Sequence, residues 1–144
     1  MKITYKGMQI DVNEKKSIFE ILKDEIENSE NEVLLCKCNN EIKRLDYVVD
    51  SDCEIELLDV TSKEGIHAYI KLATYIMSKA IYETYKDALI SVNYQLDYAT
   101  FCKLDNMEIT QEMINNIKNR MKEIIEQNIE LKKVVMTQEE AIKF

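Results

Sequence analysis

The chain begins with the stretch KITYKGMQIDVNEKKSIFE, residues 2–20, which decides the fold of its first part. Residues 2–6 and 8–12 read as two strands, because β-branched and aromatic side chains alternate with polar ones. The step Lys6-Gly7 between them suits a tight turn, since glycine adopts positive φ without strain. These residues therefore predict a β-hairpin.

A helix is predicted after the hairpin. Ser17 and Glu20 have the spacing of a capping box, in which the hydroxyl and the carboxylate satisfy the first free backbone N–H groups. We expect the helix to run to about Asn28. Strands at 33–38 and 53–60 follow, and Asn39-Asn40 suits a turn because asparagine tolerates the left-handed region. The predicted order is ββαβ…β.

The pattern Thr61-Ser62-Lys63-Glu64 is read as a second capping box, and it opens a long helix over 65–86 whose apolar residues recur at helical spacing. A new element of this length predicts a domain boundary. We therefore expect one domain over 1–60 and a second, incomplete α+β domain over 61–144. The predicted fold class of the whole chain is α+β.

The second part is expected to hold strands at 88–94 and 96–104, a helix at 110–127 and a strand at 129–136. We expect the two long helices to pack on a short antiparallel sheet. Residues 137–140, Thr-Gln-Glu-Glu, form a third capping box only a few residues before the end. A newly nucleated helix gains little from so few residues, so we expect the polypeptide to continue.

Composition indicates a globular protein without a membrane span. The 144 residues are 46% hydrophobic and 32% charged, and no apolar run approaches the roughly 18 residues that a spanning helix needs. The N-terminus lacks the apolar core of a signal peptide, which favours the cytoplasm. The four cysteines are therefore expected to be reduced thiols.

Negative charge is concentrated in the first part. Residues 1–60 carry 8 Lys and Arg against 15 Asp and Glu, a net charge of −7, whereas residues 61–144 carry 11 against 12. An acidic surface repels phosphate, because nucleic-acid affinity comes largely from Lys and Arg. We expect weak binding to tRNA. Lys118, Arg120 and Lys122, with Lys132-Lys133, either contact phosphate or form an ordinary solvated face interleaved with glutamates.

The candidate ligand-binding residues lie on the long helix. His67 is the only histidine, and at helical spacing it shares a face with Lys71 and Tyr75. This stripe either lines a ligand pocket or faces solvent. No Ser–His–Asp arrangement is recognised around the one histidine, so no catalytic residue is assigned and the chain itself is not expected to be an enzyme.

A metal site is not expected either. Cys36, Cys38 and Cys53 could approach one another on neighbouring strands, but a zinc site needs a fourth ligand and usually a wider spacing within the first pair. Buried structural thiols are the favoured interpretation. No cofactor is predicted for these residues.

Residues 1–60 resemble a TGS domain, a ubiquitin-like β-grasp unit. Residues 17–22, SIFEIL, stand where that family starts its helix, residues 37–42, KCNNEI, resemble its turn, and residues 52–58, DCEIELL, resemble its closing strand. The order of these three pieces carries the resemblance. It implies a β-grasp fold.

Residues 61–144 are similar to the start of the second domain of threonyl-tRNA synthetase, which edits mischarged tRNA. The similarity runs through Glu64-Gly65-Ile66, the 118–124 segment, and Thr137 to Ala141. The family has a His-x-x-x-His pair where this chain has Lys71 and Tyr75. Two imidazoles can act as bases near neutral pH, whereas lysine and tyrosine side chains ordinarily titrate near 10. Editing chemistry is therefore not expected.

A front end of this kind without the histidine pair resembles that of bacterial uridine-kinase-like proteins, where it precedes a P-loop kinase domain. The resemblance implies a regulatory or ligand-binding region of a nucleoside kinase, whose catalytic domain would be its partner and would bind ATP and Mg. A small nucleotide is a further candidate ligand. No P-loop motif occurs in the 144 residues. The alternatives are a tRNA-handling region of a threonyl-tRNA synthetase and a structural or dimerisation module, which leaves homo-oligomerisation open.

Overall fold

The computed structural model describes residues 1–96, 99–132 and 134–143. Strands and helices are mixed along the chain, which confirms the α+β class. Contacts group the residues into two compact units, Met1–Thr74 and Tyr75–Phe144, and the division falls within a helix. The domain boundary predicted at residue 60 stays a prediction.

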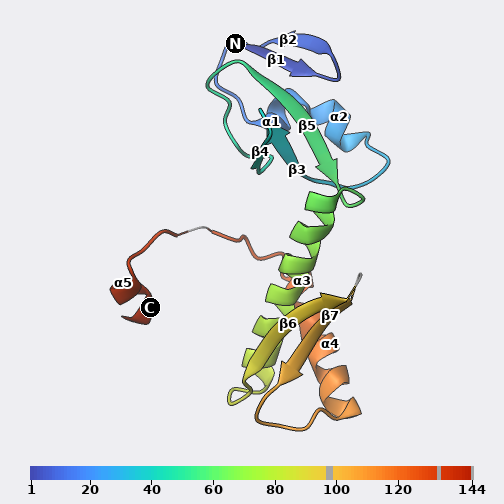
Figure 1. Cartoon of the computed structure of the whole chain (residues 1–144), viewed down its shortest axis with the longest axis vertical. Helices are drawn as coiled ribbons and strands as arrows, with labels where there is room; N and C mark the ends of the chain where they lie inside the picture. The colour runs from blue at the N-terminus through green and yellow to red at the C-terminus, as the bar shows by residue number, and fades with distance from the viewer. Residues whose placement is uncertain (97–98, 133, 144) are drawn as a thin grey trace. The chain divides into compact units, whose positions relative to one another are not determined.

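The first unit is built on a five-stranded sheet in the order β2-β1-β5-β3-β4 (Figure 1). β1 pairs with β2 in antiparallel and with β5 in parallel orientation, while β3 pairs with β4 and β5 in antiparallel orientation. This is the strand order of a β-grasp sheet. The strands are β1 Lys2–Tyr5, β2 Met8–Asp11, β3 Val33–Cys38, β4 Glu41–Lys43 and β5 Cys53–Asp59.

Both predicted turns of the first unit are present. Lys6 and Gly7 have φ angles of 48° and 77°, and Asn39 and Asn40 have φ angles of 49° and 66°. Two successive positive φ angles are the signature of the hairpin turn whose twist matches that of the flanking strands. The strand β4 after the second turn was not predicted, because its three residues are too few to show a pattern.

The helix predicted to run to about Asn28 is two short helices, α1 Ile18–Ile21 and α2 Lys23–Glu27. Leu22 leaves the helical region with φ −114° and ψ 28°, and its side chain is buried. The capping box is confirmed: the backbone N–H of Ser17 donates to the Glu20 carboxylate at 2.8 Å, and the N–H of Glu20 donates to Ser17 Oγ at 3.2 Å.

The core of the first unit lies between one face of the sheet and α1. Ile3, Ile18 and Cys36 have no exposed surface, and they belong to one cluster with seven other buried side chains. The remaining members are Tyr5, Val12, Leu22, Cys38, Val49, Cys53 and Ile55.

The long helix α3 spans Lys63–Thr84, and its cap differs from the predicted one. The residue that caps it is Ser62, whose Oγ accepts the N–H of Gly65 at 3.0 Å. Thr61 instead donates its hydroxyl to Asp59, and Glu64 pairs with Lys37. The Thr61–Glu64 capping box was therefore wrong by one residue, because two adjacent hydroxyl residues offered alternative caps.

The second unit contains the C-terminal half of α3, the hairpin β6 Ile90–Leu96 and β7 Ala99–Leu104, and the helices α4 Gln111–Glu126 and α5 Gln138–Lys143 (Figure 1). The turn between the two strands, 97–98, lies outside the described residues. α4 is tied to α3 by Arg120, which pairs with Glu83 at 2.8 Å. Both predicted caps are present: Thr110 Oγ1 accepts the N–H of Met113, and the Thr137 capping box opens α5.

The strand predicted at 129–136 is wrong for the residues described there, 129–132 and 134–136, which have no regular secondary structure. A strand is stable only when a neighbour accepts and donates its backbone hydrogen bonds. Ile129, Leu131 and the run 134–136 are apolar, but Val134 and Val135 remain 68% and 86% exposed. The residue types in this segment favour a strand, but they do not specify a neighbouring strand with which it could pair.

Within the described part of the chain, the helices are too short or too polar to cross a lipid bilayer.

Candidate functional site

The three predicted ligand-binding residues lie on α3, four residues apart. His67, Lys71 and Tyr75 are all exposed, Tyr75 by 58%. His67 and Lys71 belong to the first unit, whereas Tyr75 begins the second. Within the first unit, the four-residue spacing puts His67 and Lys71 on one face of α3. Their role in ligand binding stays a prediction.

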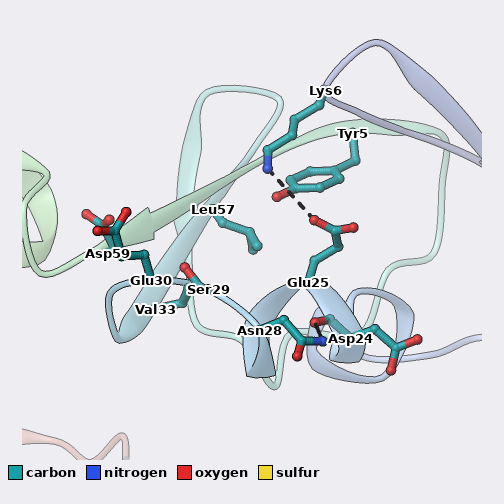
Figure 2. A pocket seen from close by; sticks show the side chains of 10 residues that line it. All are labelled: Tyr5, Lys6, Asp24, Glu25, Asn28, Ser29, Glu30, Val33, Leu57 and Asp59. Carbon is teal, nitrogen blue, oxygen red and sulfur yellow. Dashed lines mark hydrogen bonds and ion pairs between the residues drawn. The ribbon is translucent and has the colours of Figure 1, made fainter.

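A hollow of about 460 Å³ lies elsewhere in the first unit (Figure 2). Tyr5 and Lys6 border it at the end of β1, and α2 with the loop after it forms the other wall. The lining residues are Tyr5, Lys6, Asp24, Glu25, Asn28, Ser29, Glu30, Val33, Leu57 and Asp59. His67, Lys71 and Tyr75 are not among the residues that line this hollow.

The hollow is acidic, because its lining contains several carboxylates and one amine. Figure 2 shows the Lys6 side chain pointing toward Glu25 and the Tyr5 ring. Its Nζ lies 3.8 Å from the Glu25 carboxylate and 5.0 Å from the centre of the Tyr5 ring. Tyr5 above all, and Glu25 to a smaller extent, raise the pKa of Lys6. Asp24, Glu30 and Asp59 add negative charge, so the electrostatics would favour a cationic group.

Sequence reasoning missed this hollow. Its walls come from β1, α2, the loop at 28–30, β3 and β5, which span residues 5–59, about three-quarters of the first unit's length. Each acidic residue is ordinary by itself, and only the sheet order brings them together. The acidic composition of residues 1–60 was the one signal in the sequence.

Asp59, at the edge of the hollow, is already engaged. Its carboxylate accepts the Thr61 hydroxyl at 2.7 Å and an amide N–H of Asn31 at 3.2 Å. The Thr61 hydroxyl is the largest cause of the lowered pKa of Asp59. The carboxylate is therefore a structural acceptor at the start of α3.

The cysteines of the sheet are free thiols inside the core. Burial raises the pKa of Cys36 to about 11 and that of Cys53 to about 12. The Cys36 thiol donates to the carbonyl oxygen of Lys43 at 3.4 Å. Among the described residues, no three His, Cys, Asp or Glu side chains are placed to hold a metal ion. Cys36 and Cys53 are therefore protonated packing groups near neutral pH.

Arg120, in the middle of the basic group on α4, is held by carboxylates. Arg120 pairs with Glu83 at 2.8 Å and with Glu123 at 2.6 Å, and Glu123 is the largest cause of its raised pKa. Lys132 lies 3.4 Å from Glu130, and Lys133 is outside the described residues. Lys118 and Lys122 are exposed. Phosphate would have to compete with carboxylates for Arg120.

No protein-family model matches the chain. The chain is homologous to the N-terminal region of threonine–tRNA ligases. It is 27% identical over 146 aligned residues to that of Clostridium kluyveri, which covers the whole chain and 23% of the ligase. The ligase of Acetivibrio thermocellus is 28% identical with the same coverage, and that of Fusobacterium nucleatum is 29% identical over 101 residues, 69% of the chain and 16% of the ligase. The chain thus spans less than a quarter of the length of these relatives.

Proposed function

We propose that the chain is the non-catalytic front region of a cytoplasmic protein related to threonine–tRNA ligases, with a TGS-like β-grasp unit followed by an editing-like unit that has lost its chemistry. Its role would be to help position tRNA or a neighbouring domain. One observation carries the proposal: the homology covers the whole chain, while Lys71 and Tyr75 stand where the editing family has its two histidines.

The substituted pair supports the loss of hydrolysis. An amine and a phenol keep the helical spacing of the family's histidines, but they do not replace two imidazoles as acid and base near neutral pH. Loss of general acid–base catalysis alone costs about 10²–10⁴ in rate. The exposure of His67, Lys71 and Tyr75 also leaves them without the enclosed surroundings that perturb side-chain chemistry.

The charge distribution supports weak contact with tRNA. Residues 1–60 carry a net charge of −7, and the most favourable phosphate ligand, Arg120, is held by two carboxylates. Each phosphate contact contributes a slope of about −0.9 in log affinity against log salt. We therefore expect a shallow salt dependence, equivalent to about one or two phosphate contacts.

A second candidate function is the regulatory region of a nucleoside kinase. The loss of the histidine pair favours it, because a front end recruited to another enzyme no longer needs to edit tRNA. ATP and Mg would then bind to a P-loop domain outside these residues. The curated relatives support the first proposal more strongly. The gene sequence after Phe144 distinguishes the two, through a P-loop or through the motifs of a class II synthetase.

Deacylation of mischarged seryl-tRNA tests the first proposal. We expect the chain to hydrolyse it no faster than buffer, and Lys71→Ala and Tyr75→Ala to change nothing. The double variant K71H/Y75H, which restores the family's pair, serves as the matched comparison. A measurable activity that either alanine variant abolishes would show that Lys71 or Tyr75 is catalytic and would contradict the proposal.

A tRNA gel shift at two salt concentrations tests the contact with tRNA. Lys118→Ala should weaken the complex slightly, and Glu83→Gln, which frees Arg120 from one carboxylate, should strengthen it. A complex that is absent at both salt concentrations would leave domain positioning as the role. Tight binding with a steep salt slope would contradict the expected weak contact.

A further inference from the structure

The side chain of Asp59 is fixed at the point where β5 ends. Its Oδ1 accepts the backbone N–H of Thr61 at 2.9 Å and the Thr61 hydroxyl at 2.7 Å. Asn31, which precedes β3, donates to its Oδ2 at 3.2 Å. The carboxylate is therefore held both by the residues that follow it and by a distant part of the same unit.

The backbone of Asp59 is also fixed, through Ser62 and Gly65. The Ser62 hydroxyl donates to the carbonyl oxygen of Asp59 at 2.7 Å, and the same oxygen atom of Ser62 accepts the N–H of Gly65 at 3.0 Å. A Cβ atom at Gly65 would lie 1.9 Å from the Asp59 carbonyl oxygen, whereas real Cβ atoms stay at least 3.0 Å from their neighbours. Only glycine allows α3 to begin so close to β5.

A third contact lies on the face of the sheet that points away from the core cluster. Lys37 of β3 lies 3.1 Å from Glu64 in the first turn of α3 and 3.6 Å from Glu56 of β5. Leu58 alternates onto this face and is outside the core cluster, yet it is only 2% exposed. The Lys37–Glu64 pair therefore brings the first turn of α3 to the face of the sheet on which Leu58 lies.

We propose that the β-grasp sheet and residues 63–74 of α3 form one rigid body. Residues 63–74 are then a fixed arm that holds His67 and Lys71 at a set position relative to the sheet. Flexible linkers are rich in small polar residues without tertiary contacts. This junction, in contrast, has contacts through a side chain, through the backbone and on one face of the sheet. A partner that binds this part of α3 therefore detects the orientation of the β-grasp unit. The inference stands independently of the proposed function.

Residual dipolar couplings of the full chain in a weakly aligned medium test this proposal. The amides of residues 63–74 should fit the same alignment tensor as those of β1 to β5. A separate tensor for residues 63–74 would overturn the proposal without any variant.

Gly65→Ala gives a second test, because an independent helix and a rigid junction predict opposite changes in the stability of the first turn of α3. Alanine is the better helix former, so an independent helix would become more stable. A rigid junction instead predicts that the common alignment of residues 63–74 is lost and that their first-turn amides exchange at least about tenfold faster. Lys63→Ala, an exposed change in the same turn, is the control and should keep the alignment.

If Gly65→Ala does not fold, Asp59→Asn replaces it, because this change keeps the shape and removes the charge that the junction uses. Faster exchange confined to residues 61–66 would support the proposal. Unchanged couplings and unchanged exchange in every variant that folds would overturn it.

Discussion

The two units differ in how much of their sequence is buried. The first unit closes a five-stranded sheet over a cluster of ten buried side chains. In the described part of the second unit, two strands form the sheet and the buried apolar residues are Ala80, Ile81, Leu104 and Ile124. An isolated hairpin is marginal in water, whereas a sheet of this size with a helix against it folds independently. Burial, and not helix or strand propensity, sets the stability of each unit.

The largest expected effect comes from the first core. Ile3→Ala should lower the free energy of unfolding by about 4 kcal/mol, because Ile3 has no exposed surface and the rigid sheet cannot collapse into the cavity. Ile42→Ala is the matched control, since Ile42 is 53% exposed on β4, and should cost about 0.5 kcal/mol. Urea denaturation followed by circular dichroism measures both. Equal costs would contradict the contrast between buried and exposed strand positions.

Alkaline pH should weaken the first unit through its thiols. Because the folded chain raises the pKa of Cys36 from 9.0 to about 11, it binds this proton more tightly than the unfolded chain does. The stabilisation is complete below pH 9.0 and is lost as the pH rises to about 11, a change of about 3 kcal/mol for two pKa units.

Comparing denaturation of the wild-type chain and Cys36→Ala across this pH range isolates the thiol from the lysines and tyrosines that both chains share. The variant should be less stable at neutral pH and show a flatter decline. Parallel pH curves for the two chains would exclude the buried thiol as the cause.

A change among the buried residues of the second unit should lower the free energy of unfolding less than a change in the core of the first unit. Ile124→Ala should cost about 2 kcal/mol, the lower end for such a change, because the few surrounding groups can relax. Ile125→Ala is an internal control on the same helix, since Ile125 is 59% exposed. Hydrogen exchange should show the loss of protection in α4 alone. A matching loss in β1 or β5 would mean that the two units unfold together.

The smallest effect compares two capping boxes with the same chemistry. Ser17→Ala should cost about 1 kcal/mol, because α1 belongs to the first core. Thr137→Ala should leave the midpoint of urea denaturation unchanged, because α5 has six residues and none of them is buried. Thermal or urea denaturation of the two variants gives the comparison. A larger loss for Thr137→Ala would reverse the ranking of the two units.

The same two boxes predict a response to acid. Backbone and hydroxyl hydrogen bonds from Ser17 lower the pKa of Glu20 below 4.5, and Thr137 does the same for Glu140. The folded chain therefore releases these protons more readily, so the contribution of each box is present above pH 4.5 and is lost as the pH falls through the lowered pKa. Glu20→Gln should reduce the acid sensitivity of global unfolding, whereas Glu140→Gln should not.

Local signals in the sequence were sufficient wherever the structure is itself local. The turns at Lys6-Gly7 and Asn39-Asn40 and the caps at Ser17, Thr110 and Thr137 could be predicted because each depends on a few adjacent residues. The α+β class follows from the order of the predicted strands and helices. The common face of His67 and Lys71 follows from helical spacing.

Features that depend on distant partners could not be predicted. The 129–136 segment has the pattern of a strand, but the described residues there lack a neighbouring strand. β4 forms only because β3 pairs with it through three residues. The acidic hollow needs five separate elements, and the ion pairs of Lys37 join β3, β5 and the first turn of α3. In each case the missing information is which segments meet, and a single sequence does not contain it.

The two glycines of the chain differ in which substitutions they can tolerate. Every missense change of a glycine codon adds a Cβ atom. At Gly7 an added Cβ meets nothing within 4 Å, so the remaining obstacle is the positive φ, which aspartate and asparagine tolerate. At Gly65 each such mutation brings the new atom against the Asp59 carbonyl oxygen. Gly7 can therefore be substituted during evolution without loss of the hairpin turn. Gly65 has to stay a glycine as long as α3 begins in this way.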